Sequence, residues 1–180
     1  MSYYSISAIL TSAQKVPCTF DLPIPNRGFL DDNPGGDIAA HTPLPLPLYL
    51  AELLAVQQLD NRPLLTLDLP SSLQPRVLNA LKADAKSVDL RGQEVYFFEG
   101  AARVLELLEE EEVGDGLCEA FKKRAAEIAD HARNARGGTS SGEGGEFLRG
   151  LDEWERGLFR AAHDSSKAVR MWMGEVKGAK

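Results

Sequence analysis

The chain has 180 residues, of which 43% are apolar, and it carries a formal net charge of −7 at pH 7. This length suits one domain or two small ones, and the apolar content is sufficient for a buried core. Affinity for nucleic acid depends largely on clustered lysine and arginine, so the acidic balance disfavours direct DNA contact and favours protein partners.

The first third of the chain consists of short elements separated by prolines. One or two helical turns are predicted around residues 6–10, and alternating apolar side chains over residues 16–22 predict a strand. Because Pro17 has no N–H to donate to a ladder, we expect this strand at a sheet edge. Residues 23–40 are rich in Pro, Gly, Asn and Asp and predict a surface loop, and the alternating prolines at 43–47 predict an extended segment.

A short helix over about residues 48–58 and a strand over residues 65–69 complete this part. Beyond Pro70 the pattern changes to longer helices. These are predicted from Ser71 or Ser72 through Leu81, and over about residues 92–109, 117–136 and 146–174. The glutamates at 109–112 predict an acidic surface loop that leads into a turn at 114–116.

We therefore predict an α+β, mainly α, fold with two parts. Residues 1–69 are expected to form a small β-containing N-terminal domain with one or two short helices, and residues 70–180 a helical-bundle domain. Within the second part, five glycines at residues 137–145 predict a flexible loop.

The last helix has the strongest periodic signal in the chain. Its apolar residues recur in steps of four and three from Phe147 to Trp172, and Ser140 and Glu143 have capping-box spacing before it. This pattern predicts a seam that packs either inside the chain or against a partner, and we favour burial inside the chain for Trp154 and a partner contact for Phe159 and Met173. The candidate residues for the buried seam or an interface are Leu46, Leu48, Tyr49, Leu151, Trp154, Leu158, Phe159, Val169, Trp172 and Met173. The acidic and basic residues Glu153, Glu155 and Arg156 are expected on its wetter side.

No catalytic, cofactor or metal site emerges from the pattern. Cys18 and Cys118 lack a CxxC pair and are expected to be buried thiols, and the three histidines lack metal-ligand spacing. The glycine cluster lacks the Gly-Lys-Ser/Thr of a phosphate-binding loop. No apolar run approaches the roughly 20 residues that span a bilayer, so we expect a cytosolic or nuclear protein without a membrane partner.

Two alternative functions stay open on the residues alone. Lys122, Lys123, Arg124, Arg133 and Arg136 form a basic stripe, so the chain could be a self-sufficient helical DNA-binding protein. Interleaved acidic residues favour a solvated helix face instead. A hydrolase that uses Cys118 and a histidine is the other alternative.

Specific strings go further than composition, because they resemble one protein family. Residues 151–159, Leu-Asp-Glu-Trp-Glu-Arg-Gly-Leu-Phe, resemble the signature of the third partner subunit of the GINS complex. Residues 46–51, Leu-Pro-Leu-Tyr-Leu-Ala, resemble a second segment of the same family. Residues 88–90 and 4–17 fall in the matching order, so the resemblance covers most of the chain.

The resemblance implies a eukaryotic, nuclear protein that is not an enzyme, with fungi as one expected source. It implies a heterotetramer with the three other GINS subunits, required for the initiation and elongation of DNA replication. Its further partners would be the minichromosome-maintenance helicase ring and the RecJ-like cofactor of that ring, which together with GINS form the CMG replicative helicase. No cofactor is implied.

Overall fold

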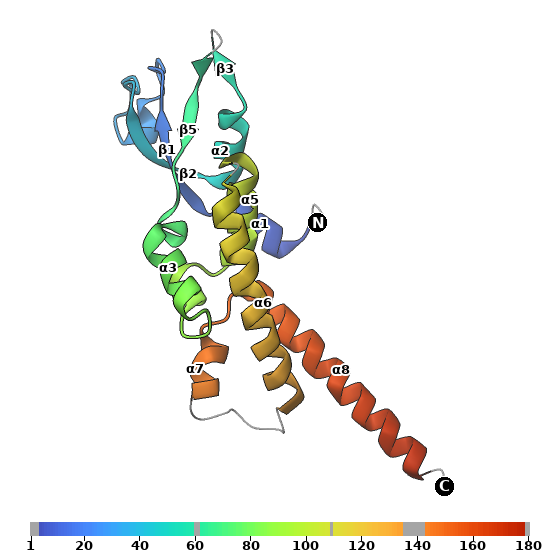
Figure 1. Ribbon diagram of the computed structural model, residues 1–180. Helices are drawn as coiled ribbons and strands as arrows, with labels where there is room; N and C mark the ends of the chain where they lie inside the picture. Colours follow the sequence, from blue (N-terminus) through green and yellow to red (C-terminus); the bar gives the residue numbers. More distant parts are fainter. Residues whose placement is uncertain (1–3, 60–61, 109, 135–142, 179–180) are drawn as a thin grey trace. The chain divides into compact units, whose positions relative to one another are not determined.

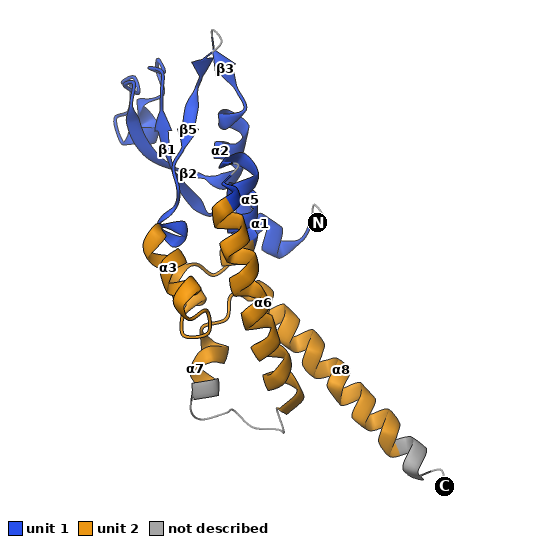
Figure 2. Cartoon of the chain, in the orientation of Figure 1, with its two compact units in different colours: residues 1–74, 99–111 blue, residues 75–98, 112–180 orange. Residues whose placement is uncertain are grey.

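The computed structural model describes residues 4–59, 62–108, 110–134 and 143–178, and these divide into two compact units (Figures 1 and 2). The first unit comprises residues 1–74 and 99–111, and the second comprises residues 75–98 and 112–180. The observed elements confirm an α+β, mainly α, fold. The division into domains at residues 69 and 70 stays a prediction.

The first unit is built on a three-stranded antiparallel sheet with the order β2-β1-β5. Its strands are β1 (Lys15–Phe20), β2 (Thr42–Pro47) and β5 (Leu65–Leu67). The predicted strands are confirmed, and the extended proline segment is itself a strand. The prediction that the Pro17 strand lies at an edge is wrong, since β1 is central.

Proline is accommodated in the central strand because its nitrogen points away from β2. The Pro17 carbonyl accepts a hydrogen bond from the Asp68 N–H at 3.0 Å, just past Leu67, the last residue of β5. In a strand the nitrogen and carbonyl of one residue point to the same side, so the Pro17 nitrogen also faces the end of β5. No ladder bond to β2 is lost. The side chain of Cys18 in β1 is buried in the core, and burial raises the pKa of its thiol to about 11.

Short helices and turns surround the sheet. They are α1 (Ile6–Ser12), the turn η1 (Gly28–Asp31), α2 (Leu48–Ala55), the paired strands β3 (Gln58–Leu59) and β4 (Arg62–Pro63), and the turn η2 (Ser71–Leu73). The predicted surface loop is more ordered than expected, because Ile24 and Ile38 form a bridge that buries Ile38. The β3–β4 pair was not predicted, since two-residue strands leave no alternation to detect.

The second unit is helical. It contains α3 (Pro75–Ala83), α4 (Leu90–Gln93), most of α6 (Glu111–Asn134), α7 (Glu143–Arg149) and α8 (Glu153–Gly178). The helix predicted over 92–109 is instead two helices, because Glu94 is extended and α5 (Phe97–Leu108) begins after it. Asp89 caps α4 by accepting the Gly92 N–H at 2.9 Å.

The predicted turn at residues 114–116 is wrong, because these residues lie within α6. The helix starts at Glu111, so Glu111 and Glu112 occupy its first turn. Carboxylates are stabilised there by the positive end of the helix dipole, so Glu111 and Glu112 favour the start of α6 rather than the predicted loop.

The predicted last helix over 146–174 is interrupted. The chain leaves helical geometry at residues 150–152, between α7 and α8. Most of the predicted flexible loop, with Ser140, lies outside the described residues, and the helix α7 already begins at Glu143.

Replacing Gly114 in α6 with alanine should raise the free energy of unfolding of the full chain by roughly 0.5–1 kcal/mol. A Cβ at this position would meet no atom within 4 Å, so only the helix propensity changes. Gly28→Ala should destabilise instead, because its Cβ would lie 2.4 Å from the Asn33 carbonyl oxygen. Urea unfolding of both variants measures the difference, and a destabilised Gly114→Ala chain would contradict the expectation.

Candidate protein-interaction surface on the last helix

The N-terminal end of α8 is held by a buried ion pair between Arg124 of α6 and Glu155 of α8. Neither side chain has any exposed surface. The guanidinium donates from Nε to Glu155 Oε1 at 2.6 Å and from Nη2 to Glu155 Oε2 at 2.8 Å, so the pair is bidentate. The prediction that Glu155 faces water is therefore wrong, as is the place of Arg124 in a solvated basic stripe.

The remaining N–H groups of Arg124 bind backbone carbonyls. Nη1 donates to the Ala85 oxygen at 2.7 Å and to the Val88 oxygen at 3.0 Å, and Nη2 reaches the Gly150 oxygen at 3.4 Å. The Phe147 ring lies 5.2 Å from the guanidinium carbon. One side chain thus joins the α3–α4 loop, the α7–α8 turn and α8 to α6.

Glu155 also belongs to a capping box with Asp152. The Glu155 N–H donates to Asp152 Oδ1 at 2.7 Å, and the Asp152 N–H donates to Glu155 Oε2 at 3.2 Å. Asp152 Oδ2 accepts the Phe98 N–H at 3.1 Å, and burial raises the pKa of the Asp152 carboxyl to about 6. The Asp-x-x-Glu spacing is visible in the sequence, and this pair, not the predicted pair of Ser140 and Glu143, begins α8.

The buried part of the predicted seam is restricted to its start. Leu151 packs with Ile128 and Phe147 in the core of the second unit, and Phe159 packs against this cluster while half-buried. Trp154 is 56% exposed, which contradicts the prediction that it is buried inside the chain. Its ring stacks on Phe121 at a centroid distance of 4.9 Å, and its centroid lies 6.4 Å from that of the Phe98 ring.

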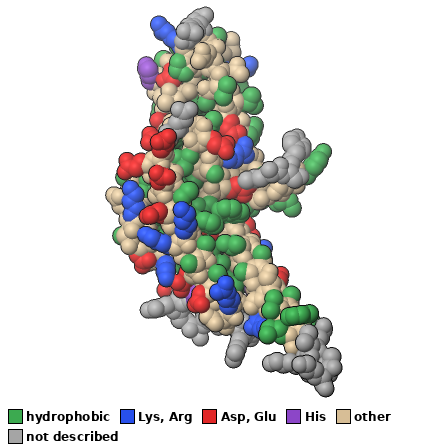
Figure 3. Space-filling model, turned by 45° about the vertical axis from the view of Figure 1, so that its right-hand side comes forward, with side chains coloured by type: hydrophobic (Ala, Val, Ile, Leu, Met, Phe, Trp, Pro, Cys, Tyr) green, Lys and Arg blue, Asp and Glu red, His purple; other side chains and the backbone are tan. Residues whose placement is uncertain are grey.

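Beyond this point α8 presents an uncovered apolar face. None of the side chains from residue 160 to residue 174 is buried. At 3.6 residues per turn, one side of the helix carries Trp154, Leu158, Ala161, Ala162, Ser165, Ala168, Val169, Trp172 and Met173. Hydrophobic side chains accordingly gather toward the far end of α8 (Figure 3), where Trp172 is 65% and Val169 55% exposed.

The other candidate residues lie in the first unit. Leu46 and Leu48 are buried in its core, whereas Tyr49 at the start of α2 is exposed. The two cysteines considered for chemistry also lie in different environments. Cys18 is buried but Cys118 is exposed, so the expectation of two buried thiols is wrong for Cys118. Cys118 lies on the exposed side of α6, and the periodicity of the sequence alone does not show which side of this helix is exposed.

Among the described residues, no group of three or more His, Cys, Asp or Glu side chains is arranged to hold a metal ion. In the same part of the chain, none of the helices combines the length and apolar character needed to cross a lipid bilayer.

Comparison with known families agrees with this architecture. Residues 72–174 match the GINS complex protein helical bundle domain, and residues 4–56 match the PSF3 N-terminal domain. These matches define a protein of the GINS class, with a small N-terminal domain before the helical bundle.

Relatives of known name extend over nearly the whole chain. The DNA replication complex GINS protein psf3 of Aspergillus fumigatus is 56% identical over 98% of this chain and 99% of its own length. The corresponding protein of Phaeosphaeria nodorum is 57% identical over 98% of both chains, and that of Saccharomyces cerevisiae is 31% identical over 96% of this chain and 98% of its own. The chain belongs to the PSF3 family.

Glu155→Ala should lower the free energy of unfolding by about 3–5 kcal/mol, because it leaves the Arg124 guanidinium buried without its counter-charge. Glu153→Ala is the matched control. Glu153 meets Arg91 and Arg160 at 3.4 Å on a partly exposed surface, so its loss should cost within about 1 kcal/mol. Denaturant unfolding of the full chain compares the two, and equal effects would contradict the assigned roles.

The stability of the parent chain relative to Asp152→Asn should fall as the pH rises from about 4 to about 7. An unfolded aspartate has a pKa of ~3.9, and burial raises the pKa of the folded Asp152 to about 6, so the folded state holds more protons in this range. Asparagine keeps an oxygen for the Glu155 N–H without titrating. Urea unfolding of both chains at several pH values measures the difference between their free energies of unfolding. A difference that stays constant or grows as the pH rises would contradict the prediction.

Proposed function

We propose that the chain is a non-catalytic subunit of the GINS complex and acts in DNA replication by assembling with other proteins. Membership of the PSF3 family supports this, since the similar fungal proteins are named as DNA replication complex GINS proteins. The observation that carries the proposal in this chain is the uncovered apolar face of α8.

The energetics of α8 favour a permanent partner. Helices in proteins gain most of their stability from packing an apolar face, and this helix has no buried side chain over residues 160–174. Each large apolar side chain left in water forfeits about 1.5–3 kcal/mol of burial energy. Val169, Trp172 and Met173 lie on this face, so they are the proposed anchors for a sister subunit in the GINS heterotetramer.

Gly157 fits the same proposal. A glycine within a helix costs about 1 kcal/mol relative to alanine, yet a Cβ at this position would meet nothing within 4 Å in this chain. A neighbouring backbone that approaches closely would explain why a glycine occupies this position. Together with Ala161 and Ala168, Gly157 would allow a sister helix to pack tightly.

The finer part of the proposal concerns the larger assembly. We infer a nuclear complex in which GINS joins the minichromosome-maintenance ring and its RecJ-like cofactor in the CMG helicase. The net charge of −7 favours protein partners over DNA. Burial of Arg124 counts against the alternative of a self-sufficient DNA-binding protein, because that hypothesis needs the basic residues of 122–136 on the surface.

Val169→Asp should abolish co-purification with the three sister subunits after co-expression, because a carboxylate would be buried in the proposed interface. Lys167→Asp, on the exposed opposite side of α8, is the matched control and should assemble like the parent. Circular dichroism checks that both chains remain helical. A Val169→Asp chain that assembles fully would overturn α8 as the interface, and a parent chain that never joins the three sisters would overturn membership of the complex.

A further inference from the structure

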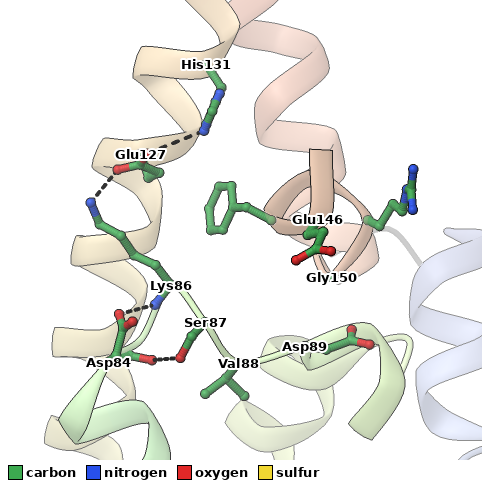
Figure 4. A pocket seen from close by; sticks show the side chains of 11 residues that line it. Asp84, Lys86, Ser87, Val88, Asp89, Glu127, His131, Glu146 and Gly150 are labelled. Atoms are coloured by element: carbon green, nitrogen blue, oxygen red, sulfur yellow. Dashed lines mark hydrogen bonds and ion pairs between the residues drawn. The ribbon is translucent and has the colours of Figure 1, made fainter. Parts of the chain in front are cut away.

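The second unit contains a pocket of about 840 Å³ (Figure 4), and none of the described residues of α8 lines it. Its walls are the loop between α3 and α4, the middle of α6, and α7. The α3–α4 loop contributes Asp84, Lys86, Ser87, Val88 and Asp89. Glu127 and His131 come from α6, and Glu146, Phe147, Arg149 and Gly150 come from α7 and the residue after it.

The walls of this pocket are held in place by hydrogen bonds. Arg124 holds the α3–α4 loop through the Ala85 and Val88 carbonyls. The Leu90 and Arg91 N–H groups both donate to the Gly150 oxygen, at 3.0 and 3.2 Å, which ties the loop to the end of α7. A pocket built in this way is formed before any ligand arrives, so little ordering is required on binding.

Carboxylates outnumber cations around the pocket. Asp84, Asp89, Glu127 and Glu146 line it, against Lys86 and Arg149. The Lys86 ammonium is paired with Glu127, whose hydrogen bond raises the lysine pKa, with further contributions from the charges of Glu127, Asp84 and Asp130. The pocket therefore already stabilises one cation of the chain itself.

Two carboxylates of the pocket have oxygens to spare. Within the described part of the chain, the Glu146 carboxylate makes no hydrogen bond or ion pair, and the Asp89 carboxylate uses only Oδ1, to cap α4. They come from different elements, and the Glu146 side chain is directed toward the loop that carries Val88 and Asp89 (Figure 4). Phe147 and the half-buried Val88 supply apolar surface beside them.

We propose that this pocket binds an arginine side chain of a partner protein, with the guanidinium between Glu146 and Asp89 and the aliphatic stem against Val88. A planar guanidinium has five donors and can reach two carboxylates at once, which a compact ammonium does less well. The stem covers apolar surface while the charged head stays among the carboxylates. The pocket carries this inference independently of membership of the GINS complex.

The test uses the full-length chain, methyl-labelled at valine and purified alone or with its sister subunits. N-acetyl-arginine amide is titrated at low ionic strength, and the Val88 methyl signals, assigned from a Val88→Ala chain, report binding. N-acetyl-citrulline amide, which has nearly the same shape without the charge, is the ligand control. We expect a saturable shift with the arginine probe and none with citrulline.

Variants then locate the charge that is responsible. Glu146→Gln with Asp89→Asn should weaken binding by about three- to tenfold, while asparagine still accepts the Gly92 N–H. Asp115→Asn removes an exposed charge outside the pocket and should bind like the parent. If the double variant does not fold, Glu146→Gln alone tests the same prediction, because Glu146 is exposed. The proposal is overturned by the absence of a saturable shift, by equal shifts with citrulline, by a shift with inorganic phosphate instead, or by unchanged affinity in the Glu146 variants.

Discussion

The buried ion pair of Arg124 and Glu155 is the interaction on which the helical unit depends. Burying two charges costs several kcal/mol per ion, and the cost is offset only when the geometry is good and the other donors are satisfied. Here the pair is bidentate, and the remaining guanidinium N–H groups meet carbonyls of the α3–α4 loop and of Gly150. The segment 151–159 therefore has a structural role. Its Asp152 and Glu155 cap the start of α8, and Glu155 fixes this helix to α6 through Arg124.

This attachment at one end explains how α8 can be both anchored and uncovered. Leu151 and Phe159 pack on the core near the ion pair, while Val169 and Trp172 further along meet nothing in the second unit that covers them. A long helix with one end held in place can present its apolar face without the chain itself burying that face. The residues of α8 that stabilise the fold thus differ from those proposed to bind a sister subunit.

The two proposed binding regions differ in their chemistry although Arg124 organises both. The face of α8 is apolar and would bind through area removed from water, which depends little on salt. The pocket beside α7 is lined by carboxylates and would bind a cation through interactions that salt screens. Salt dependence therefore offers a means of distinguishing partners that use one region from partners that use the other.

The sequence by itself determined the elements whose signal is local. Period-two alternation identified β1 and β5, and period-3.6 stripes identified the long helices, because both follow from backbone geometry. Only the tertiary structure decided which polar residues are buried. Arg124 and Glu155 are 31 residues apart and look like ordinary surface charges on their own helices, and burial depends on what packs above each of them. Trp154 shows the converse, since its periodicity predicts a covered face but cannot say whether this chain or another protein covers it.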